Sequence, residues 1–280
     1  MMADDHKAVI AALAAVVDAG ESAALATVIS TDGSLPRHAG SKMLVYPDGR
    51  IVGTVGGGAM EAKVIESALQ ALRDGEASLQ TYTLNNLTDG DPGICGGTAQ
   101  IFIEPVLGAP HLLVIGAGHV GVALAQLGKW AGYYVTLCDD RAEFCNPEHA
   151  PDCDEYVVCP PSQVADYANI SARTSVAAVT RGLPVDIDLI PALLATDAAY
   201  IGLIGSRRRW ALTVRDLVAE RGLTVDDLER IRAPIGLEIE AETPKEIAVS
   251  ILAEIIMVRR GGTGQPMRYK PEEMRQKSAK

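Results

Sequence analysis

The first part of the chain combines two helical patterns with several short strand patterns. Apolar residues recur on one helix face over residues 6–18, Gly20 follows as a stop signal, and a second helix is predicted over residues 59–73. Strands are predicted over residues 23–30, 41–46, 50–55, 78–84 and 99–106, with residues 31–36 as a turn and 85–98 as a polar loop. This pattern predicts a small α+β domain over residues 1–107.

From residue 111 onward, short apolar strands alternate with helical segments. Strands are predicted over residues 111–115, 133–138, 155–159, 175–180 and 200–204, and helices over 118–131, 186–196, 207–220 and 247–258, with a short helix after Pro161. Such alternation is typical of a parallel sheet with right-handed crossovers. Residues 107–110 form a short linker, and residues 263–280 a polar tail. The predicted fold class is therefore α/β: a C-terminal Rossmann-like parallel sheet over residues 111–262 plus the smaller N-terminal α+β domain.

A Gly-x-Gly-x-x-Gly motif follows the first strand of this second domain. Gly116 permits a tight turn, Gly118 lets the backbone approach a pyrophosphate, and Gly121 lets helix and strand pack closely. Asp139 ends the next strand about 20 residues further on, where an acid accepts hydrogen bonds from ribose hydroxyls. The spacing predicts a site for NAD(P) or another nucleotide. The alternative is a Rossmann-like fold with an empty pocket.

A second strand-to-helix turn, Gly205-Ser206, lies at the carboxyl edge of the same predicted sheet. Arg207, Arg208 and Arg209 open the helix that follows, where their charges oppose the helix macrodipole. They therefore serve either an anion or partner, or form a solvated basic patch.

One loop of the first domain is rich in groups that bind anions. Residues 33–42 include Arg37, His38 and Lys42 together with serines. Such a loop could hold a negatively charged ligand.

Three consecutive glycines, Gly56, Gly57 and Gly58, separate a strand from the helix that carries Glu61. Each glycine costs folding entropy, which is easier to understand if the backbone adopts φ > 0 or approaches a ligand closely. A strained turn without a ligand is the alternative.

Cys95 is flanked by glycines that leave its thiol unshielded. Their N–H groups could stabilise a thiolate or an anionic ligand, whereas the alternative is an inert cysteine in a turn. Cys138, Cys145, Cys153 and Cys159 are spaced too widely for Cys-x-x-Cys metal knuckles and are predicted to be core or surface residues.

Composition narrows the class of protein. A chain of 280 residues with 48% apolar residues favours two domains with buried cores. A net charge of −11 argues against a nucleic-acid partner. No apolar run long enough to span a membrane and no signal peptide is evident, and five cysteines fit a reducing compartment, so a cytoplasmic protein without a membrane partner is expected. The capping box at Thr243 opens an apolar helix that could pack in the core or between the subunits of a homodimer.

Five motifs in register give the chain a family resemblance. They are Gly-Ser-x-Pro-Arg, Gly-Thr-Val-Gly-Gly-Gly-x-Met-Glu, Cys-Gly-Gly, Gly-Ala-Gly-His-Val and Tyr-Ile-Gly-Leu-Ile-Gly-Ser-Arg-Arg. Together they resemble the XdhC/CoxI family, the xanthine dehydrogenase accessory factors, over about residues 8–260.

The resemblance implies a cofactor chaperone, a binding protein rather than an enzyme. Such a protein binds molybdenum cofactor (molybdopterin), protects it while a cysteine desulfurase helps to sulfurate it, and delivers it to a xanthine-dehydrogenase-type molybdenum hydroxylase. By motif, Cys95 is the candidate for catalysis and for contact with the metal or its sulfur. The loops at residues 37–42 and 56–61 are candidates for the rest of the cofactor. Candidates for a phosphate or nucleotide are Gly116, Gly118, His119 and Gly121.

Two other classes of function remain as alternatives. An NAD(P)-dependent oxidoreductase needs a proton donor, but the sequence after the glycine motif contains no Tyr-x-x-x-Lys and no convincing histidine with a carboxylate partner. A regulatory nucleotide-sensing module would explain the second domain, yet it would have no evident use for the N-terminal loops.

Overall fold

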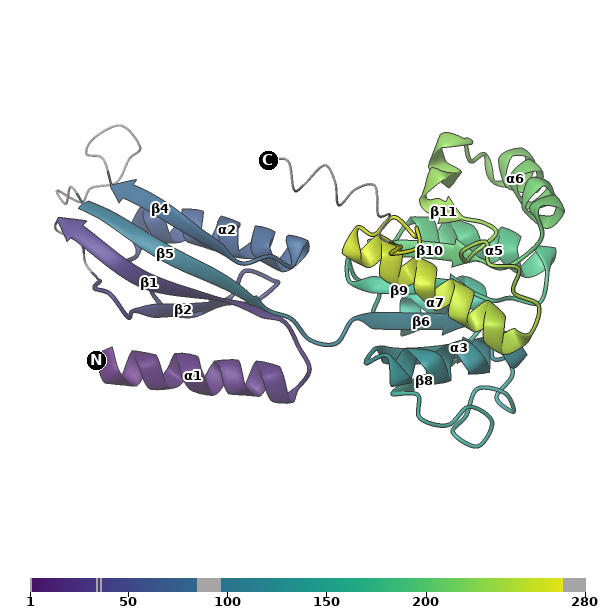
Figure 1. Cartoon of the computed structure of the whole chain (residues 1–280), viewed down its shortest axis with the longest axis horizontal. Coiled ribbons are helices and arrows are strands. Elements are labelled where there is room, and N and C mark those ends of the chain that lie inside the picture. The colour runs from purple at the N-terminus through teal and green to yellow at the C-terminus, as the bar shows by residue number, and fades with distance from the viewer. Residues whose placement is uncertain (1, 34, 36, 85–96, 269–280) are drawn as a thin grey trace. The chain divides into compact units, whose positions relative to one another are not determined.

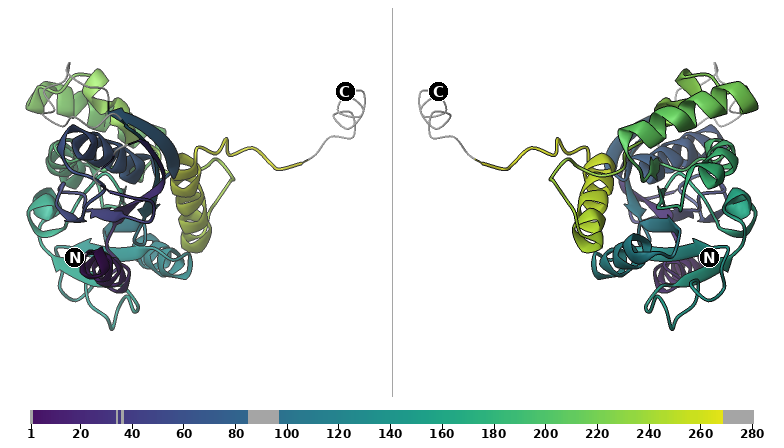
Figure 2. Two further views of the ribbon diagram at one scale, coloured as in Figure 1. Left: turned by 90° about the vertical axis from the view of Figure 1, so that its left-hand side faces the viewer. Right: turned by 90° about the vertical axis from the view of Figure 1, so that its right-hand side faces the viewer.

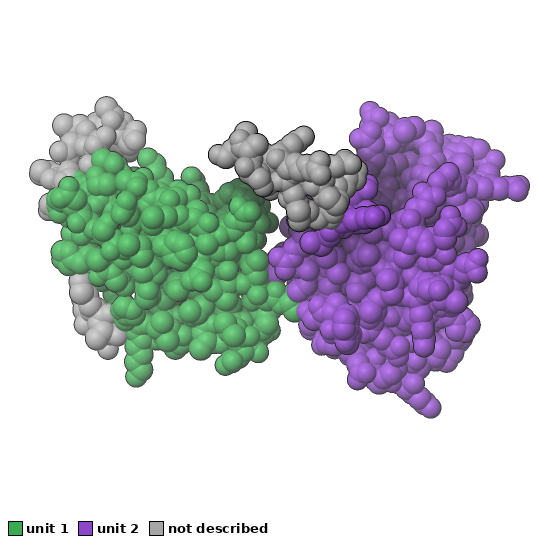
Figure 3. All heavy atoms as spheres, in the orientation of Figure 1, with its two compact units in different colours: residues 1–109 green, residues 110–280 purple. Residues whose placement is uncertain are grey.

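The computed structural model describes residues 2–33, 35, 37–84 and 97–268, and it describes the side chains of all of these except residues 2–4 and 84. The chain divides into two compact units, Met1–Ala109 and Pro110–Lys280 (Figure 3). Within the described residues, no helix combines the length and the apolar character needed to cross a bilayer.

Unit 1, residues 1–109, is built on a five-stranded antiparallel sheet in the order β3-β2-β1-β5-β4 (Figure 1). Its elements are α1 (Met2–Asp18), β1 (Ala23–Gly33), β2 (Lys42–Val45), β3 (Ile51–Gly53), α2 (Gly58–Asp74), β4 (Ser78–Leu84) and β5 (Gly97–Val106). Alternate residues of β1 face opposite sides of the sheet: Ala24 and Ala26 join the core under α2, whereas Leu25 packs with Val9 of α1. The two helices therefore cover opposite faces.

Strand β1 continues through part of the segment that the sequence predicts to be a turn. Thr31, Asp32 and Gly33 pair with residues of β5 after a register shift that follows Val28. Polar, exposed side chains gave this segment the composition of a turn, but the backbone groups find partners on β5, so the strand persists. The turn prediction over residues 31–33 was wrong.

Unit 2, residues 110–280, contains a six-stranded parallel sheet in the order β11-β10-β9-β6-β7-β8. Its elements are β6 (His111–Ile115), α3 (His119–Trp130), β7 (Tyr134–Asp139), β8 (Glu155–Val158), η1 (Pro161–Gln163), α4 (Val164–Tyr167), β9 (Thr174–Ala178), α5 (Leu183–Leu194), β10 (Tyr200–Leu203), α6 (Arg207–Arg221), η2 (Asp226–Arg230), β11 (Ile231–Arg232) and α7 (Pro244–Arg260). The strand order reverses between β6 and β9, as in a Rossmann fold, so the predicted fold class is confirmed.

Helices cover both faces of this sheet. Leu112 and Val114 of β6 pack in a core shared with α3 and α7, which lie side by side (Figures 1 and 2). Leu113 and Ile115 face the opposite core, to which α4, α5 and α6 contribute. The alternation along β6 therefore reflects burial on both sides, as expected of a central parallel strand.

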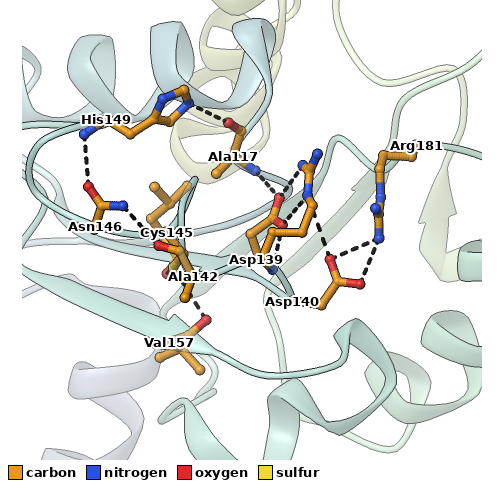
Figure 4. A network of polar contacts seen from close by, with 11 residues as sticks. Ala117, Asp139, Asp140, Ala142, Cys145, Asn146, His149, Val157 and Arg181 are labelled. Atoms are coloured by element: carbon orange, nitrogen blue, oxygen red, sulfur yellow. Dashed lines mark hydrogen bonds and ion pairs between the residues drawn. The ribbon is translucent and has the colours of Figure 1, made fainter.

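The crossover from β7 to β8 contains no helix. Residues 140–154 form turns that side chains hold in place: the Cys145 thiol lies 3.2 Å from the Leu137 carbonyl oxygen, and the Asn146 side chain donates to the Ala142 carbonyl at 2.8 Å. Asn146 also accepts from the backbone N–H of His149 at 3.0 Å (Figure 4). Side-chain hydrogen bonds here supplement the backbone hydrogen bonds of short turns, such as that from the Cys145 N–H to the Arg141 carbonyl.

The end signals of α7 are as predicted. Thr243 accepts from the backbone N–H of Glu246, the Glu246 side chain returns to the cap, and Pro244 occupies the first turn. Gly261 ends the helix with φ of 66°. The short strand β11 was not predicted, because two residues give no periodicity.

Candidate functional site

The fold of unit 1 brings the basic loop and the glycine-rich turn together. Strands β2 and β3 are antiparallel, and Met43 of β2 lies opposite Gly53 of β3. Lys42, which precedes Met43, therefore lies beside Thr54, which follows Gly53. Both line a hollow of about 130 Å³, together with the loop at residues 37–41 and the first turns of α1. The amino end of α1 lies on the same side of unit 1 as the arrowhead of β1 (Figure 1).

Two basic side chains, Arg37 and Lys42, and one acidic side chain, Asp5, line this hollow. Arg37, whose side chain is 19% exposed, donates to Asp5 of α1 at 3.0 Å. Lys42 donates to the Thr27 hydroxyl at 3.0 Å, and His38 also lines the hollow. The volume is below the roughly 300 Å³ of a typical small-molecule pocket, so the hollow suits an anionic group rather than a whole cofactor.

The glycine turn beside the hollow has the backbone geometry that only glycine adopts readily. Gly56, Gly57 and Gly58 have φ of 151°, 79° and 64°. The Thr54 hydroxyl accepts from the Gly56 N–H at 3.1 Å and donates to the Glu61 carboxylate. Glu61 thus secures the turn, while Gly57 caps α2 without a side-chain acceptor. The first N–H groups of α2 are consequently left for solvent or an anion.

Cys95 lies outside the described residues, so its predicted role stays a prediction. The residues on either side of its segment are described: Leu84 pairs with Gly97, which also lies opposite Gly33 at the end of β1. Of the two described residues that flank this segment, Gly97 therefore lies next to the strand from which the basic loop starts, whereas Leu84 lies one strand further away.

The other cysteines behave as core residues. Cys138, Cys145 and Cys159 are buried, and burial raises the pKa of each thiol; burial also raises the pKa of Cys153, to about 11. Over residues 2–33, 35, 37–84 and 97–268, no group of three or more histidine, cysteine, aspartate or glutamate side chains is placed to hold a metal ion.

In unit 2, the glycine motif has the steric properties that its spacing indicates. Gly116 has φ of 114°, and a Cβ there would lie 2.6 Å from the Val179 carbonyl oxygen. A Cβ at Gly121 would overlap the Gly116 carbonyl oxygen, whereas one at Gly118, the cap of α3, would meet open space. The geometry leaves room for a ligand to approach at Gly118. Binding of a nucleotide there remains a prediction.

The Asp139 side chain fixes the glycine turn through a hydrogen bond to its backbone. Its buried carboxylate accepts from the Ala117 N–H at 2.7 Å and from the backbone and guanidinium of Arg141 at 2.8 to 3.0 Å. Burial opposes the charged form, but these donors outweigh burial and lower the pKa of Asp139 to about 2. His149 donates to the carbonyl of the same Ala117 at 3.0 Å (Figure 4). A ribose bound to Asp139, as the sequence predicts, would have to share carboxylate oxygens that already accept hydrogen bonds from Ala117 and Arg141.

The depressed pKa of Asp139 makes the stability of unit 2 depend on pH. A carboxyl whose pKa is lower in the folded state stabilises the fold above its unfolded value, near pH 4, and this stabilisation is lost as the pH falls toward 2. We expect Asp139→Asn to lower the free energy of unfolding by about 2 kcal/mol near neutral pH and by about half as much near pH 3. Urea unfolding followed by tryptophan fluorescence would measure both values, because Trp130 and Trp210, the two tryptophans of the chain, both lie in unit 2.

The control for this pH effect is Asp140→Asn, since Asp140 is 36% exposed and pairs with Arg181 at the surface. We expect its cost to stay below about 1 kcal/mol at both pH values. If Asp139→Asn destabilises the protein as much near pH 3 as near neutral pH, the low pKa assigned to Asp139 is wrong.

After the second glycine turn, one of the three consecutive arginines forms an ion pair with a buried carboxylate. Gly205 precedes Ser206, whose hydroxyl accepts from the Arg209 N–H at 3.1 Å. The Arg209 guanidinium binds the fully buried Asp186 at 2.8 Å and the Thr180 hydroxyl at 2.7 Å. Burial raises the pKa of Asp186, and the donors from Thr180 and Arg209 offset part of that rise. Arg209 is therefore a structural residue, not a free anion ligand, which corrects the prediction for the arginine triplet; Arg207 and Arg208 are exposed.

An ion pair spans the crevice at the point where the strand order reverses. Arg181, after β9, donates to the Asp140 carboxylate, after β7, at 2.7 Å (Figure 4). The crevice beside this pair, lined by Gly116, Asp139 and Thr180 among others, holds only about 10 Å³. In this arrangement the usual nucleotide position of a Rossmann fold is narrow.

Together, the fold and the two sites define a class of protein: a Rossmann unit joined to an antiparallel α+β unit that carries a basic loop beside a glycine-capped helix. The comparison with known families agrees with this description. Residues 112–255 match the XdhC Rossmann domain, and residues 16–83 match the XdhC and CoxI family. The chain belongs to the XdhC and CoxI family.

Several relatives are similar over most of this chain. The uncharacterized protein YqeB of Escherichia coli K12 is 37% identical over 243 residues, which are 86% of this chain but only 44% of YqeB, so the chain spans less than half of that relative. A probable xanthine dehydrogenase subunit from Bacillus subtilis 168 is 25% identical, covering 89% of this chain and 96% of the relative. The molybdenum cofactor insertion chaperone PaoD of Escherichia coli K12 is 24% identical, covering 92% and 90%. A crystal structure described as a xanthine dehydrogenase from Bacillus halodurans is 22% identical with a TM-score of 0.49, covering 95% of this chain and 98% of that one.

Proposed function

We propose that this protein is an accessory factor that binds molybdenum cofactor, supports its sulfuration by a cysteine desulfurase and inserts it into a xanthine-dehydrogenase-type molybdenum hydroxylase. Membership of the XdhC and CoxI family supports this role, as does the similarity to an insertion chaperone and to a probable xanthine dehydrogenase subunit. The proposal includes a cytoplasmic location, a homodimer and a nucleotide, NAD(P) or another, in unit 2.

The observation that carries the proposal is the convergence of two anion-binding elements in unit 1. Arg37, His38 and Lys42 line one hollow with Thr54, which also secures the glycine turn at the open end of α2. Molybdopterin is an anionic, phosphate-bearing pterin with a dithiolene-bound metal, so its phosphate fits the charge and the size of this hollow.

The roles of the residues follow from their chemistry. Arg37 and Lys42 would hold the phosphate, and the N–H groups at the start of α2 would add further donors. Cys95, as a soft thiol, is the candidate contact for the metal or its sulfur. When bound, the cofactor supplies the molybdenum centre and its exchangeable sulfur; the chain's own residues orient it and shield it from water.

The test is cofactor binding by paired variants. We expect Arg37→Ala with Lys42→Ala to weaken molybdopterin binding at least tenfold, because two charge-assisted hydrogen bonds are lost. Cys95→Ala is expected to weaken retention of the sulfurated form. Binding is measured by the fluorescence of the oxidised pterin released from protein after gel filtration.

A matched control is Arg50→Ala, because Arg50 is an exposed arginine of the same sheet that pairs with Asp48 on the β2–β3 hairpin, outside the hollow. Its binding should equal that of the unmodified chain. Unchanged binding by the Arg37 and Lys42 double variant would reject the hollow as the cofactor site, and unchanged retention by Cys95→Ala would remove the thiol from the mechanism.

A further inference from the structure

A second hollow lies in unit 2, on the face of the sheet covered by α3 and α7. It has a volume of about 480 Å³, within the range of small-molecule pockets. The first turns of α3, the first residues of α7 and the loop between β7 and β8 line it. It is far larger than the crevice beside the Arg181–Asp140 pair, which has a volume of about 10 Å³.

The walls of this α3–α7 groove are mainly apolar. Val122 and Ala123 share one face of α3 with His119, because positions three and four apart along a helix point the same way. Pro244 faces them from the first turn of α7. The capping box of α7 already binds backbone N–H groups at the start of this helix. Toward the groove, α7 therefore presents the apolar ring of Pro244 rather than free N–H donors.

Three basic side chains stand around these apolar walls. The side chains of His119 and Lys245 line the groove, and within the described part of the chain neither side chain makes a hydrogen bond or an ion pair. His149 is fixed, because its Nε2–H donates to the Ala117 carbonyl at 3.0 Å (Figure 4). Its ring also meets that of Phe144 edge-on, with the ring centroids 4.9 Å apart. Within the described residues, its Nδ1 has no partner. Uncommitted basic groups around one groove are unexpected in a chain with a net charge of −11.

We infer that this groove binds a flat heteroaromatic anion of about mononucleotide size, with the ring against Val122, Ala123 and Pro244 and the charge toward Lys245 and the histidines. The uncapped amino end of α3 lies at the same place and favours the same charge. The inference rests on that part of the proposed function which places a nucleotide in unit 2, and it leaves the hollow of unit 1, which the Arg37 and Lys42 variants test, unaffected. It also places the ligand of the Rossmann unit outside the crevice that Arg181 and Asp140 span.

Calorimetric titration of the full chain with three probes tests this inference. We expect saturable binding of AMP or of pterin-6-carboxylate, and much weaker binding of inorganic phosphate, which has no ring. The tighter of the two heteroaromatic probes identifies the source of the ligand as a nucleotide or a pterin.

Three variants locate the site. Ala123→Glu places a carboxylate in the groove and should abolish binding, while Lys245→Gln should weaken binding about tenfold. Arg181→Gln alters the crevice and should leave the affinity unchanged. Circular dichroism checks the fold of Ala123→Glu, and Lys245→Gln, at an exposed position, keeps the test valid if that variant fails to fold.

The inference is overturned if neither heteroaromatic probe binds, if Lys245→Gln binds as tightly as the unmodified chain, or if Arg181→Gln loses binding. Equal affinity for phosphate and AMP would also overturn it, because the apolar walls would then have no role.

Discussion

Replacing Gly121 with alanine is expected to destabilise unit 2 by about 3 kcal/mol or more. The new Cβ would overlap the Gly116 carbonyl oxygen, which belongs to a turn that Asp139 and His149 hold from two sides. Alanine has a helix propensity about 1 kcal/mol better than glycine, but this gain is smaller than the cost of separating α3 from β6. Urea unfolding followed by the fluorescence of Trp210, which packs against the core of unit 2, measures the loss.

Gly118→Ala is the matched control for this experiment. A Cβ at Gly118 meets no atom within 4 Å and the residue has φ of −76°, so the change should cost no more than about 1 kcal/mol. Equal losses from the two substitutions would contradict the packing role assigned to Gly121. The same pair separates stability from ligand binding, because the sequence assigns close approach to a ligand to Gly118.

Removing the buried carboxylate of Asp186 is the second change with a large expected effect. In Asp186→Ala, the Arg209 guanidinium, 21% exposed, loses its counterion and two hydrogen bonds, while the Thr180 hydroxyl loses its acceptor. An uncompensated buried charge of this kind costs about 3–5 kcal/mol. The free energy of unfolding from urea titration, again by tryptophan fluorescence, is the measurement.

Asp188→Ala provides the control on the same helix. Asp188 of α5 is 58% exposed and pairs with Arg221 at the surface, so its loss should cost less than about 1 kcal/mol. A double variant, Asp186→Leu with Arg209→Met, should recover much of the stability because it removes both buried charges together. If Asp186→Ala costs no more than Asp188→Ala, the buried pair is not a stabilising contact.

The sequence predicted those features that depend on local steric demands. The spacing of Gly116, Gly118 and Gly121 indicated the turn and its close packing, and Thr243 with Glu246 indicated the start of α7. Local signals succeed here because Gly121 packs on the Gly116 carbonyl five positions away and Thr243 accepts from the Glu246 N–H three positions away.

Contacts between distant residues could not be predicted in the same way. Arg209 looked like a free basic residue because its partner, Asp186, is 23 positions away and had no pattern of its own. Arg141 was likewise missed, although its position two residues after Asp139 is a usable signal for a carboxylate that is already bound.

The candidate sites show the same division. The basic loop at residues 37–42 and the glycine turn at 56–58 were each evident from composition, but their meeting depends on the pairing of β2 with β3. Of the α3–α7 groove, the sequence indicated only His119 as a candidate for a phosphate or nucleotide. Its walls were missed, because apolar residues at helical spacing, such as Val122 and Ala123, indicate core rather than an open surface.

The crossover between β7 and β8 places an unusual evolutionary constraint on this protein. A helical crossover keeps its path through many sequence changes, because its backbone bonds do not depend on which side chains it carries. Here the backbone bonds form only short turns, and the side chains of Cys145, Asn146 and His149 add the contacts that tie the segment to its surroundings. Drift at any one of them would remove one of these contacts, whereas insertions at an exposed turn of the loop would leave the sheet intact, so relatives should differ in the length of this loop before they differ in its anchors.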